Sequence, residues 1–242
     1  YQQHPGGIQV VGFPFLSSNV ETTDHCNRKC SFCPNSLIDK PAEFMPLDMY
    51  TDILRQLMEG GYEGRLHLYQ RGEPLLDDRL VEWTAMARKA LPKCHLYIST
   101  NGDHLTRKVA HQLIKAGMNE IEVSHYDGER LELMRETSHL HGIVLHYDKK
   151  LSNPKGHWFN RGGLVDVPAA MKFENNFCWW IFRKAAIKCN GDYMLCCADW
   201  FGGKFGNVKD HTIMELWEGK GVWRYREAHL QHRPKSMPMT TG

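Results

Sequence analysis

The chain has 242 residues, of which 42% are hydrophobic and 24% are charged, and this composition is ordinary for a soluble globular protein. Its formal net charge of +2 gives no case for nucleic acid or an anionic membrane as a partner. No apolar run approaches the roughly 18 residues that a membrane-spanning helix needs. No secretory signal is visible at the N-terminus, which does not begin with Met.

The first part of the chain predicts alternating strands and helices. A strand that begins near residue 19 runs toward a group of cysteines. Apolar spacing then predicts helices at 47–61, 77–91 and 105–117, and strands at 65–70, 95–100, 119–125 and 142–147. We expect Asp77 or Asp78 to cap the second helix and Gly117 to end the third. This βαβα order implies a parallel sheet, either open or closed into a barrel.

The pattern changes from about residue 165. The segment 186–200 predicts a β-hairpin, with Asn190 and Gly191 in a type I′ turn between two apolar arms. A helix is expected near 211–218. We therefore predict a second, smaller module that is rich in cysteine.

The stretch DHCNRKCSFCPN contains Cys26, Cys30 and Cys33. Three thiolates on one loop can bind three corners of a [4Fe-4S] cluster and leave the fourth iron open to a ligand that is not protein. A zinc site would need a fourth ligand, such as His25, and three unrelated structural cysteines are a further alternative. Without a visible signal, eight cysteines favour metal or cluster ligands over disulfides. Cys94 begins an apolar run and is expected to be a buried structural thiol.

The motif C-x3-C-x2-C, with the aromatic Phe32 before its last cysteine, resembles the signature of the radical S-adenosylmethionine (AdoMet) superfamily. Where that family has Gly-Gly-Glu-Pro, this chain has Arg71 in place of the first glycine. The resemblance implies that the residues near AdoMet are Phe32, Gly72, Glu73, Pro74, Ser99, Asn101 and Ser124. Residues at the carboxyl ends of parallel strands gather at one edge of a sheet, which agrees with this placement.

The resemblance also implies a fold and a chemistry. The expected α/β fold is a partial (β/α)6 TIM-like radical SAM barrel over 15–165, followed by a small twitch or SPASM-like module over 166–242. The implied cofactors are a [4Fe-4S] cluster and AdoMet, whose reductive cleavage yields a 5′-deoxyadenosyl radical that abstracts a hydrogen atom from a C–H bond. A flavodoxin- or ferredoxin-type reductant and a reducing cytoplasm are implied as well.

A second set of cysteines resembles the opening of the SPASM or twitch domain, which binds an auxiliary [4Fe-4S] cluster. Cys178 and Cys196 bracket Gly191 as C-x12-G-x4-C. The two further cysteines of that domain have no counterpart in the tail HRPKSMPMTTG. Cys189, Cys197 or residues beyond the end could complete the site, or the site could have been lost. The structural alternative is four cysteines that line a small apolar core.

Several strings, among them FNRGGLVDVP, resemble the twitch-containing aminocyclitol dehydrogenases of antibiotic biosynthesis. By this resemblance Arg161 binds substrate, and His125 binds substrate or transfers a proton. A salt-bridged surface arginine and a hydrogen-bonded barrel histidine are the structural alternatives.

The predicted reaction is the two-electron oxidation of a secondary alcohol to a ketone, in an aminocyclitol or sugar-like small molecule. The auxiliary cluster accepts the remaining electron. An epimerase with Cys189 or Cys197 as hydrogen-atom donor and a peptide-modifying enzyme are alternative enzymes. A non-enzymatic iron–sulfur or zinc module is the alternative outside enzymology.

Overall fold

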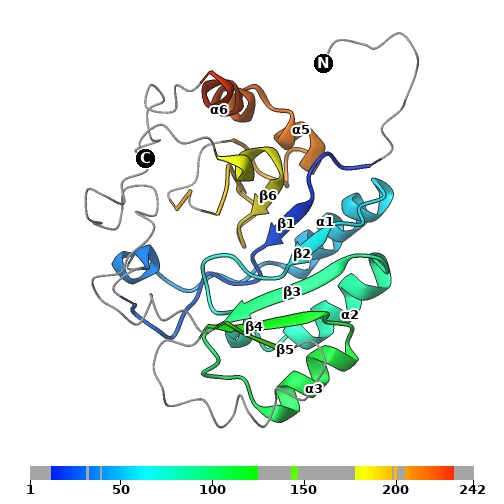
Figure 1. Cartoon of the computed structure of the whole chain (residues 1–242), viewed down its shortest axis with the longest axis vertical. Helices are drawn as coiled ribbons and strands as arrows, with labels where there is room; N and C mark the ends of the chain where they lie inside the picture. The colour runs from blue at the N-terminus through cyan, green and yellow to red at the C-terminus, as the bar shows by residue number, and fades with distance from the viewer. Residues whose placement is uncertain are drawn as a thin grey trace.

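A computed structural model of the protein describes residues 12–30, 33–38, 40–124, 143–146, 178–197, 199–200 and 205–231. In this part of the chain a seven-stranded sheet has the order β5-β4-β3-β2-β1-β6-β7 (Figure 1). Its strands are β1 (Ser17–Val20), β2 (Arg65–His67), β3 (His95–Thr100), β4 (Glu120–Ser124), β5 (Ile143–His146), β6 (Lys184–Ile187) and β7 (Tyr193–Met194). Strands β1 to β6 pair in parallel, and β7 pairs antiparallel to β6.

Helices connect the parallel strands and cover one face of the sheet (Figure 1). The α-helices are α1 (Leu47–Glu59), α2 (Leu80–Ala90), α3 (Arg107–Lys115), α5 (Ile213–Trp217) and α6 (Lys220–Leu230). The 3-10 helices are η1 (Pro34–Leu37), η2 (Pro74–Leu76) and η6 (Trp179–Phe182). The parallel α/β sheet predicted from the sequence is therefore confirmed, and it is open, with β5 and β7 at its edges in the described part of the chain, which is consistent with a partial barrel.

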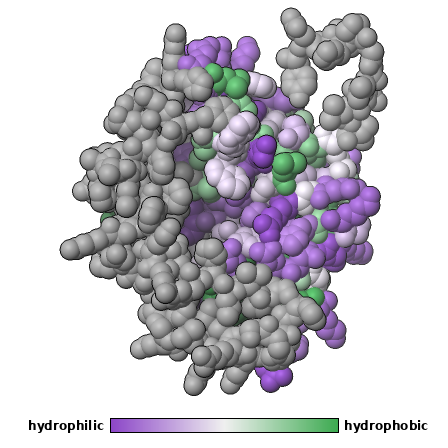
Figure 2. Space-filling model, viewed as in Figure 1, coloured by the Kyte–Doolittle hydropathy of each residue, from purple (hydrophilic) through white to green (hydrophobic). Residues whose placement is uncertain are grey.

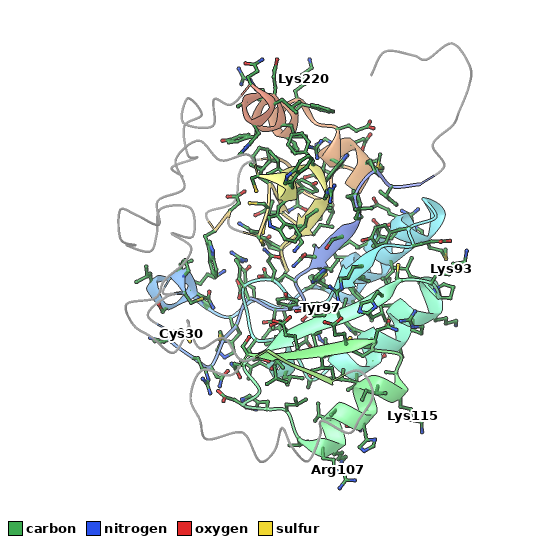
Figure 3. All side chains as sticks on the ribbon, in the orientation of Figure 1. Cys30, Lys93, Tyr97, Arg107, Lys115 and Lys220 are labelled. Carbon is green, nitrogen blue, oxygen red and sulfur yellow. The ribbon has the colours of Figure 1, made fainter. Side chains whose placement is uncertain are left out.

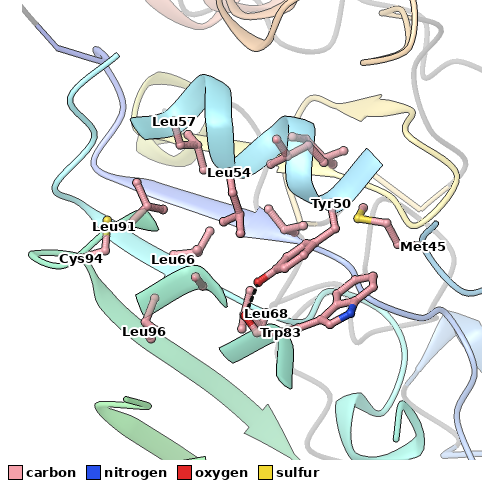
Figure 4. Close-up of a cluster of buried hydrophobic side chains, with 14 of the residues drawn as sticks. Met45, Tyr50, Leu54, Leu57, Leu66, Leu68, Trp83, Leu91, Cys94 and Leu96 are labelled. Carbon is pink, nitrogen blue, oxygen red and sulfur yellow. Dashed lines mark hydrogen bonds between the residues drawn. The ribbon is translucent and has the colours of Figure 1, made fainter. Parts of the chain in front are cut away.

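The hydrophobic core lies between the sheet and α1 to α3. Helix α1 forms because its apolar residues recur every three or four positions, and it buries Met49, Tyr50, Ile53, Leu54 and Leu57. The Tyr50 ring stacks on the Trp83 ring of α2, 4.1 Å away between centroids. The Tyr50 hydroxyl donates to the Trp83 carbonyl at 2.9 Å, as Figure 4 shows.

Alternation along the strands separates this core from the opposite face of the sheet. Val20, Leu66 and Ile98 are fully buried in the core cluster. Their neighbours Asn19 and His67 therefore point to the other side, because successive side chains of a strand point to opposite faces. We call this other side, which faces away from α1 to α3, the interior face.

Several local predictions need correction. Helix α2 begins at Leu80 with Arg79 at its N-cap, so neither Asp77 nor Asp78 caps it. The Asp77 carboxylate instead binds the Arg79 guanidinium at 2.8 Å. Helix α6 was not predicted at all.

Two other local predictions are confirmed. Gly117 follows the last turn of α3 with φ of 106°, a backbone conformation that favours glycine. Cys94 is 2% exposed, and its thiol donates to the Tyr62 carbonyl at 3.2 Å.

The predicted hairpin is present, but its turn differs from the prediction. The Gly191 amide donates to the Lys188 carbonyl at 2.9 Å, so Cys189 and Asn190 are the central residues of the turn. Gly191 follows them with φ of 93°. This is a four-residue turn with a glycine bulge rather than a type I′ turn centred on Asn190 and Gly191.

The sheet includes strands from both predicted modules. Strand β6, from the second predicted module, pairs in parallel with β1 through Ser17↔Lys184 to Val20↔Ile187. The hairpin is thus an extension of the barrel sheet.

Across the described surface in Figure 2 hydrophilic residues predominate and hydrophobic ones are scattered. Among the described residues, none of the helices has both the length and the apolar character needed to span a membrane.

Candidate functional site

The first three cysteines lie on the loop that connects β1 to α1. After Val20 the chain is anchored by the Met45 amide, which donates to the Thr22 carbonyl at 2.8 Å. The Cys33 amide donates to the Cys30 carbonyl at 3.0 Å, and η1 follows directly. Figure 3 shows Cys30 on this loop, beside the carboxyl ends of the strands.

The three thiols lie close enough together to influence one another. Burial raises the pKa of Cys30 to about 11, and the charges of Cys33 and Cys26 contribute to this rise. Burial also raises the pKa of Cys26, whereas the Arg28 amide, which donates to that sulfur, acts to lower it. A set of three neighbouring sulfur ligands on one loop fits an iron–sulfur cluster, which would stabilise the deprotonated thiolates.

The loop after β2 makes backbone contact with the segment just before Cys26. A Cβ atom added at Gly72 would lie 2.4 Å from the Thr23 carbonyl oxygen and 2.7 Å from that of His25. The Glu73 amide donates to the His25 carbonyl at 2.7 Å. Only glycine permits this approach, which explains why a glycine precedes Glu73.

The Glu73 carboxylate joins the ends of β2 and β3. It accepts hydrogen bonds from the Thr100 hydroxyl at 2.5 Å, the Asn101 amide at 2.7 Å and the Leu75 amide at 3.0 Å. Burial raises the pKa of Glu73, and these hydrogen bonds act in the opposite direction. With its oxygens used inside the protein, Glu73 shapes the loop that begins η2 at Pro74.

Two residues between the first cysteines connect the cysteine loop to the loop after β3. The Arg28 guanidinium donates to both oxygens of Asp103, at 2.7 and 2.6 Å. The Asn27 side chain donates through Nδ2 to Asp103 at 2.7 Å, and its Oδ1 accepts from the Asn101 side chain at 2.9 Å. The sequence motifs alone did not single out Asn27, Arg28 or Asp103. The position of Asn27 and Arg28 inside the cysteine motif is the feature of the sequence that could have pointed to them.

The remaining predicted site residues, both cofactor-binding and catalytic, divide into two groups. The hydroxyls of Ser99 and Ser124, at the ends of β3 and β4, lie 3.5 Å apart, so the structure does bring these strand ends together. Phe32, His125 and Arg161 lie outside the described residues.

Arg71, which replaces the first glycine of the family motif, is buried in an ion pair with Glu21. Its guanidinium donates to both Glu21 oxygens, at 2.9 and 2.7 Å, and its amide also donates to Glu21 at 2.9 Å. Glu21 follows β1 directly and also accepts from the Cys189 amide at 3.2 Å. One carboxylate therefore links β1, the loop after β2 and the hairpin turn.

The second set of cysteines is divided between the two ends of the hairpin. Cys189 lies at the turn, 1% exposed, with its sulfur 3.9 Å from a Glu43 carboxylate oxygen. Burial raises its pKa, and the nearby carboxylates of Glu21 and Asp24 raise it further. A buried thiol among carboxylates is a poor thiolate ligand.

Cys196 and Cys197 lie at the other end, where β7 has run back toward the start of β6. Burial lowers the pKa of Lys184, the first residue of β6, and the nearby Cys197 and Cys196 act to raise it. From Cys178 the chain reaches Lys184 through η6. The structure thus groups the segments of these three cysteines and separates Cys189 from them by the length of a strand.

The interior face of the sheet presents a row of polar and aromatic side chains that the sequence had not suggested. Asn19 pairs in register with His67 on β2, and His67 with Tyr97 on β3. The His67 ring lies 4.7 Å from the Tyr97 ring and 5.8 Å from that of Tyr69. Burial lowers the pKa of His67 to about 2, and nearby cations contribute, so its imidazole is neutral. The Tyr97 hydroxyl donates to the Glu122 carboxylate.

Two family models match the chain. The model of the radical SAM superfamily matches residues 20–141, which is half of the chain. The model of an iron–sulfur cluster-binding domain, SPASM, matches residues 178–239.

Proteins of known activity are similar to this chain over different lengths. The S-adenosyl-L-methionine-dependent 2-deoxy-scyllo-inosamine dehydrogenase of Niallia circulans is 30% identical over 235 residues, which cover 92% of this chain and 90% of that protein. GTP 3′,8-cyclase of Helicobacter pylori is 33% identical over 43% of this chain and 33% of its own length. PqqA peptide cyclase of Streptomyces rochei is 30% identical over 50% of this chain and 32% of its own length.

Solved structures of AdoMet-binding proteins are also similar to this chain. The crystal structure of BtrN in complex with AdoMet and 2-DOIA matches with a TM-score of 0.79 and 26% identity, over 93% of this chain and 91% of BtrN. The structure of anSMEcpe with bound AdoMet matches with a TM-score of 0.57 at 15% identity, over 89% of this chain and 84% of that one, which is a likeness of fold alone.

Proposed function

The chain belongs to the radical SAM superfamily, and from that premise we propose that it oxidises a secondary alcohol of an aminocyclitol or sugar-like small molecule to a ketone. The observation that carries this proposal is the extent of the similarity to the 2-deoxy-scyllo-inosamine dehydrogenase, which covers 92% of the chain and so includes the cysteine-rich hairpin. Similarity to the GTP cyclase and the peptide cyclase covers half of the chain or less and favours neither of those reactions.

The superfamily uses a [4Fe-4S] cluster and AdoMet, and the residues on the first loop fit both. Cys26, Cys30 and Cys33 would bind the cluster, and Gly72 lets the loop after β2 approach the backbone just before Cys26. When bound, the two cofactors supply a 5′-deoxyadenosyl radical that takes a hydrogen atom from a substrate carbon. The protein fixes the loops around them through the hydrogen bonds of Glu73 and Asp103.

Oxidation of an alcohol carbon to a ketone removes two hydrogens. One leaves as the abstracted hydrogen atom, the hydroxyl loses a proton, and one electron must pass to an acceptor. We assign substrate binding to Arg161, and substrate binding or proton transfer to His125. The match to the SPASM domain supports an auxiliary cluster, which we propose as the acceptor, with Cys178 and Cys196 among its ligands. Cys189 is set apart among carboxylates, which favours Cys197 over Cys189 as a third ligand of the auxiliary cluster.

One observation supports the epimerase as a second candidate. Burial raises the pKa of Tyr69, and the negative charges of Glu122 and Cys197 raise it further, which places the Cys197 thiol near the interior face. A thiol in that position could return a hydrogen atom to a substrate radical. Replacement of Cys197 by alanine would then abolish turnover with the iron content unchanged, whereas a loss of iron in the same variant would show that Cys197 is a ligand of the auxiliary cluster.

The reaction can be tested with anaerobically reconstituted protein, AdoMet and dithionite, and with 2-deoxy-scyllo-inosamine as the probe. We expect one ketone and one 5′-deoxyadenosine for each AdoMet consumed, measured by liquid chromatography and mass spectrometry. One solvent deuterium in an unoxidised product, after reaction in D2O, would show epimerisation. Absence of 5′-deoxyadenosine with every reductant would contradict radical SAM activity itself.

The partners follow from the same chemistry. We propose a flavodoxin or ferredoxin as the reductant, because the first cluster must receive one electron at low potential for each AdoMet cleaved. An open iron site is sensitive to oxygen, so we propose that the protein works in a reducing cytoplasm.

A further inference from the structure

Among the buried polar atoms that have no hydrogen-bond partner in the described part of the chain, two lie in register on adjacent strands of the interior face. They are Oδ1 of Asn19 and Nδ1 of His67, on residues that are 2% and 7% exposed. Folded proteins satisfy the great majority of such atoms, because a buried polar group without a partner costs stability. Two of them on neighbouring strands indicate a ligand that the protein binds there.

The two atoms belong to one site. Asn19 and His67 are register partners on adjacent parallel strands, so their side chains leave the same face about 5 Å apart. His67 ends β2 and Asn19 is one residue before the end of β1. Both therefore lie just below the loops that carry the cysteine motif and Gly72, at the edge where α/β proteins place their chemistry.

The neighbours of this pair define the chemical character of its surroundings. On one side the register partner of Asn19 is Ala186, which has only a methyl side chain. On the other side the Tyr97 and Tyr69 rings flank His67 and offer apolar faces. Beyond them the Glu122 carboxylate accepts from Tyr97 and adds negative charge to the same face.

The hydrogen-bonding atoms of Asn19 and His67 that have no partner restrict the chemical groups that a ligand can present to them. The Asn19 side chain already donates through Nδ2 to the Tyr69 carbonyl at 3.1 Å, which fixes the amide so that Oδ1 remains an acceptor. Neutral His67 accepts at Nδ1 when its proton is on Nε2 and donates there when the proton is on Nδ1. A ligand must therefore offer a donor to Asn19 and a matching donor or acceptor to His67, and hydroxyl groups offer both.

We propose that Asn19 and His67 bind adjacent hydroxyl or amino groups of a cyclic polyol or aminocyclitol substrate, with the tyrosine rings against its C–H faces. This inference rests on the proposed function and names the residues that select its substrate. Asn19 and His67 are positioning residues, and they leave the hydrogen abstraction itself to the cofactors.

The test compares His67→Phe with the wild-type protein, using 2-deoxy-scyllo-inosamine as the probe. Phenylalanine keeps the ring and its aromatic contacts but removes Nδ1. We expect the probe to bind roughly 10- to 100-fold more weakly by calorimetry with AdoMet present, since a polar group of the substrate loses its partner. The thermal midpoint of the ligand-free variant should equal or exceed that of the wild type, because an unsatisfied buried atom has been removed. His67→Asn restores a hydrogen-bonding side-chain amide near the position of Nδ1, so this variant should bind the probe more tightly than His67→Phe.

Ser18 provides a matched control on the same strand. Its hydroxyl is also buried without a described partner, but it lies on the helix-facing side beside Leu66. Ser18→Ala should leave probe binding unchanged. Should His67→Phe fail to fold, Asn19→Ser removes the Asn19 acceptor while it keeps a polar side chain, and the same loss of affinity is expected.

The possible results separate the two proposals. Wild-type affinity in His67→Phe, or in Asn19→Ser, overturns the assignment of this pair and leaves the dehydrogenase proposal intact. A structural role for His67 is shown if His67→Phe has a lower thermal midpoint and weaker probe binding, and His67→Asn does not restore that binding. This result overturns the assignment as well. If the wild-type protein cleaves AdoMet but binds neither 2-deoxy-scyllo-inosamine nor scyllo-inositol, the proposed substrate class and this inference both fail.

Discussion

The two cysteine-containing regions of this protein differ in how their ligands are assembled. Cys26, Cys30 and Cys33 lie on one loop, and that loop is attached to the ends of β2 and β3 by hydrogen bonds to Glu73, Asn101 and Asp103. The second set is spread over η6, the hairpin turn and the segment after β7, and Cys189 is separated from Cys196. A site built on one loop is organised before its metal arrives, whereas a site built from several segments depends on the hairpin for its geometry.

The largest expected effect comes from the first region. Cys26→Ala should abolish 5′-deoxyadenosine formation and lose about four irons per chain, because three thiolates are the minimum for a site-differentiated cluster. Iron and sulfide analysis with electron paramagnetic resonance measures this. Cys189→Ala serves as the control and should keep its full iron content, and an equal loss in both variants would contradict the division between the regions.

The second region should respond differently. Cys178→Ala or Cys196→Ala should lower the iron content from about eight to about four per chain, while AdoMet cleavage in the absence of substrate continues. Formation of ketone should fall below detection, since the electron acceptor is lost. A wild-type content of only about four irons would instead show that this chain has no auxiliary cluster.

The connection between the regions passes through the buried pair of Arg71 and Glu21. Removal of one partner leaves an uncompensated buried charge, so Arg71→Met should lower the free energy of unfolding by about 3–5 kcal/mol. Chemical denaturation of the protein under anaerobic conditions measures this. Glu21→Gln combined with Arg71→Met should recover part of the lost free energy of unfolding. A double variant as unstable as Arg71→Met alone would show that the unpaired Glu21 charge is not the cause of the loss.

The smallest effect is expected at the connection between the cysteine loop and the loop after β3. Arg28 and Asp103 are partly exposed, so Arg28→Met should lower the free energy of unfolding by only about 1 kcal/mol. The same variant should slow reconstitution of the first cluster, followed by its absorbance, because the loop loses its attachment. Arg55→Met on the exposed face of α1, which removes pairs to Asp52 and Glu59, is the matched control and should reconstitute at the wild-type rate.

Local sequence determined the parts of this protein whose residues are close in the chain. Spacing of apolar residues predicts α1 because i, i+3 and i+4 positions share one helix face, as Ile53, Leu54 and Leu57 do. The cysteine motif and Gly72-Glu73 predict the first site because loops at the carboxyl ends of parallel strands meet at one edge.

Only the tertiary structure decided the contacts between distant segments. Arg71 meets Glu21 across 50 positions, and Cys189 meets Glu43 across 146, separations at which the sequence carries no pairing signal. The parallel pairing of β6 with β1 likewise joins the cysteine-containing hairpin to the main sheet, far along the chain from β1. The same pairing of β1 with β2 brings the unpartnered atoms of Asn19 and His67 together, because register is set by the whole sheet and not by either strand alone.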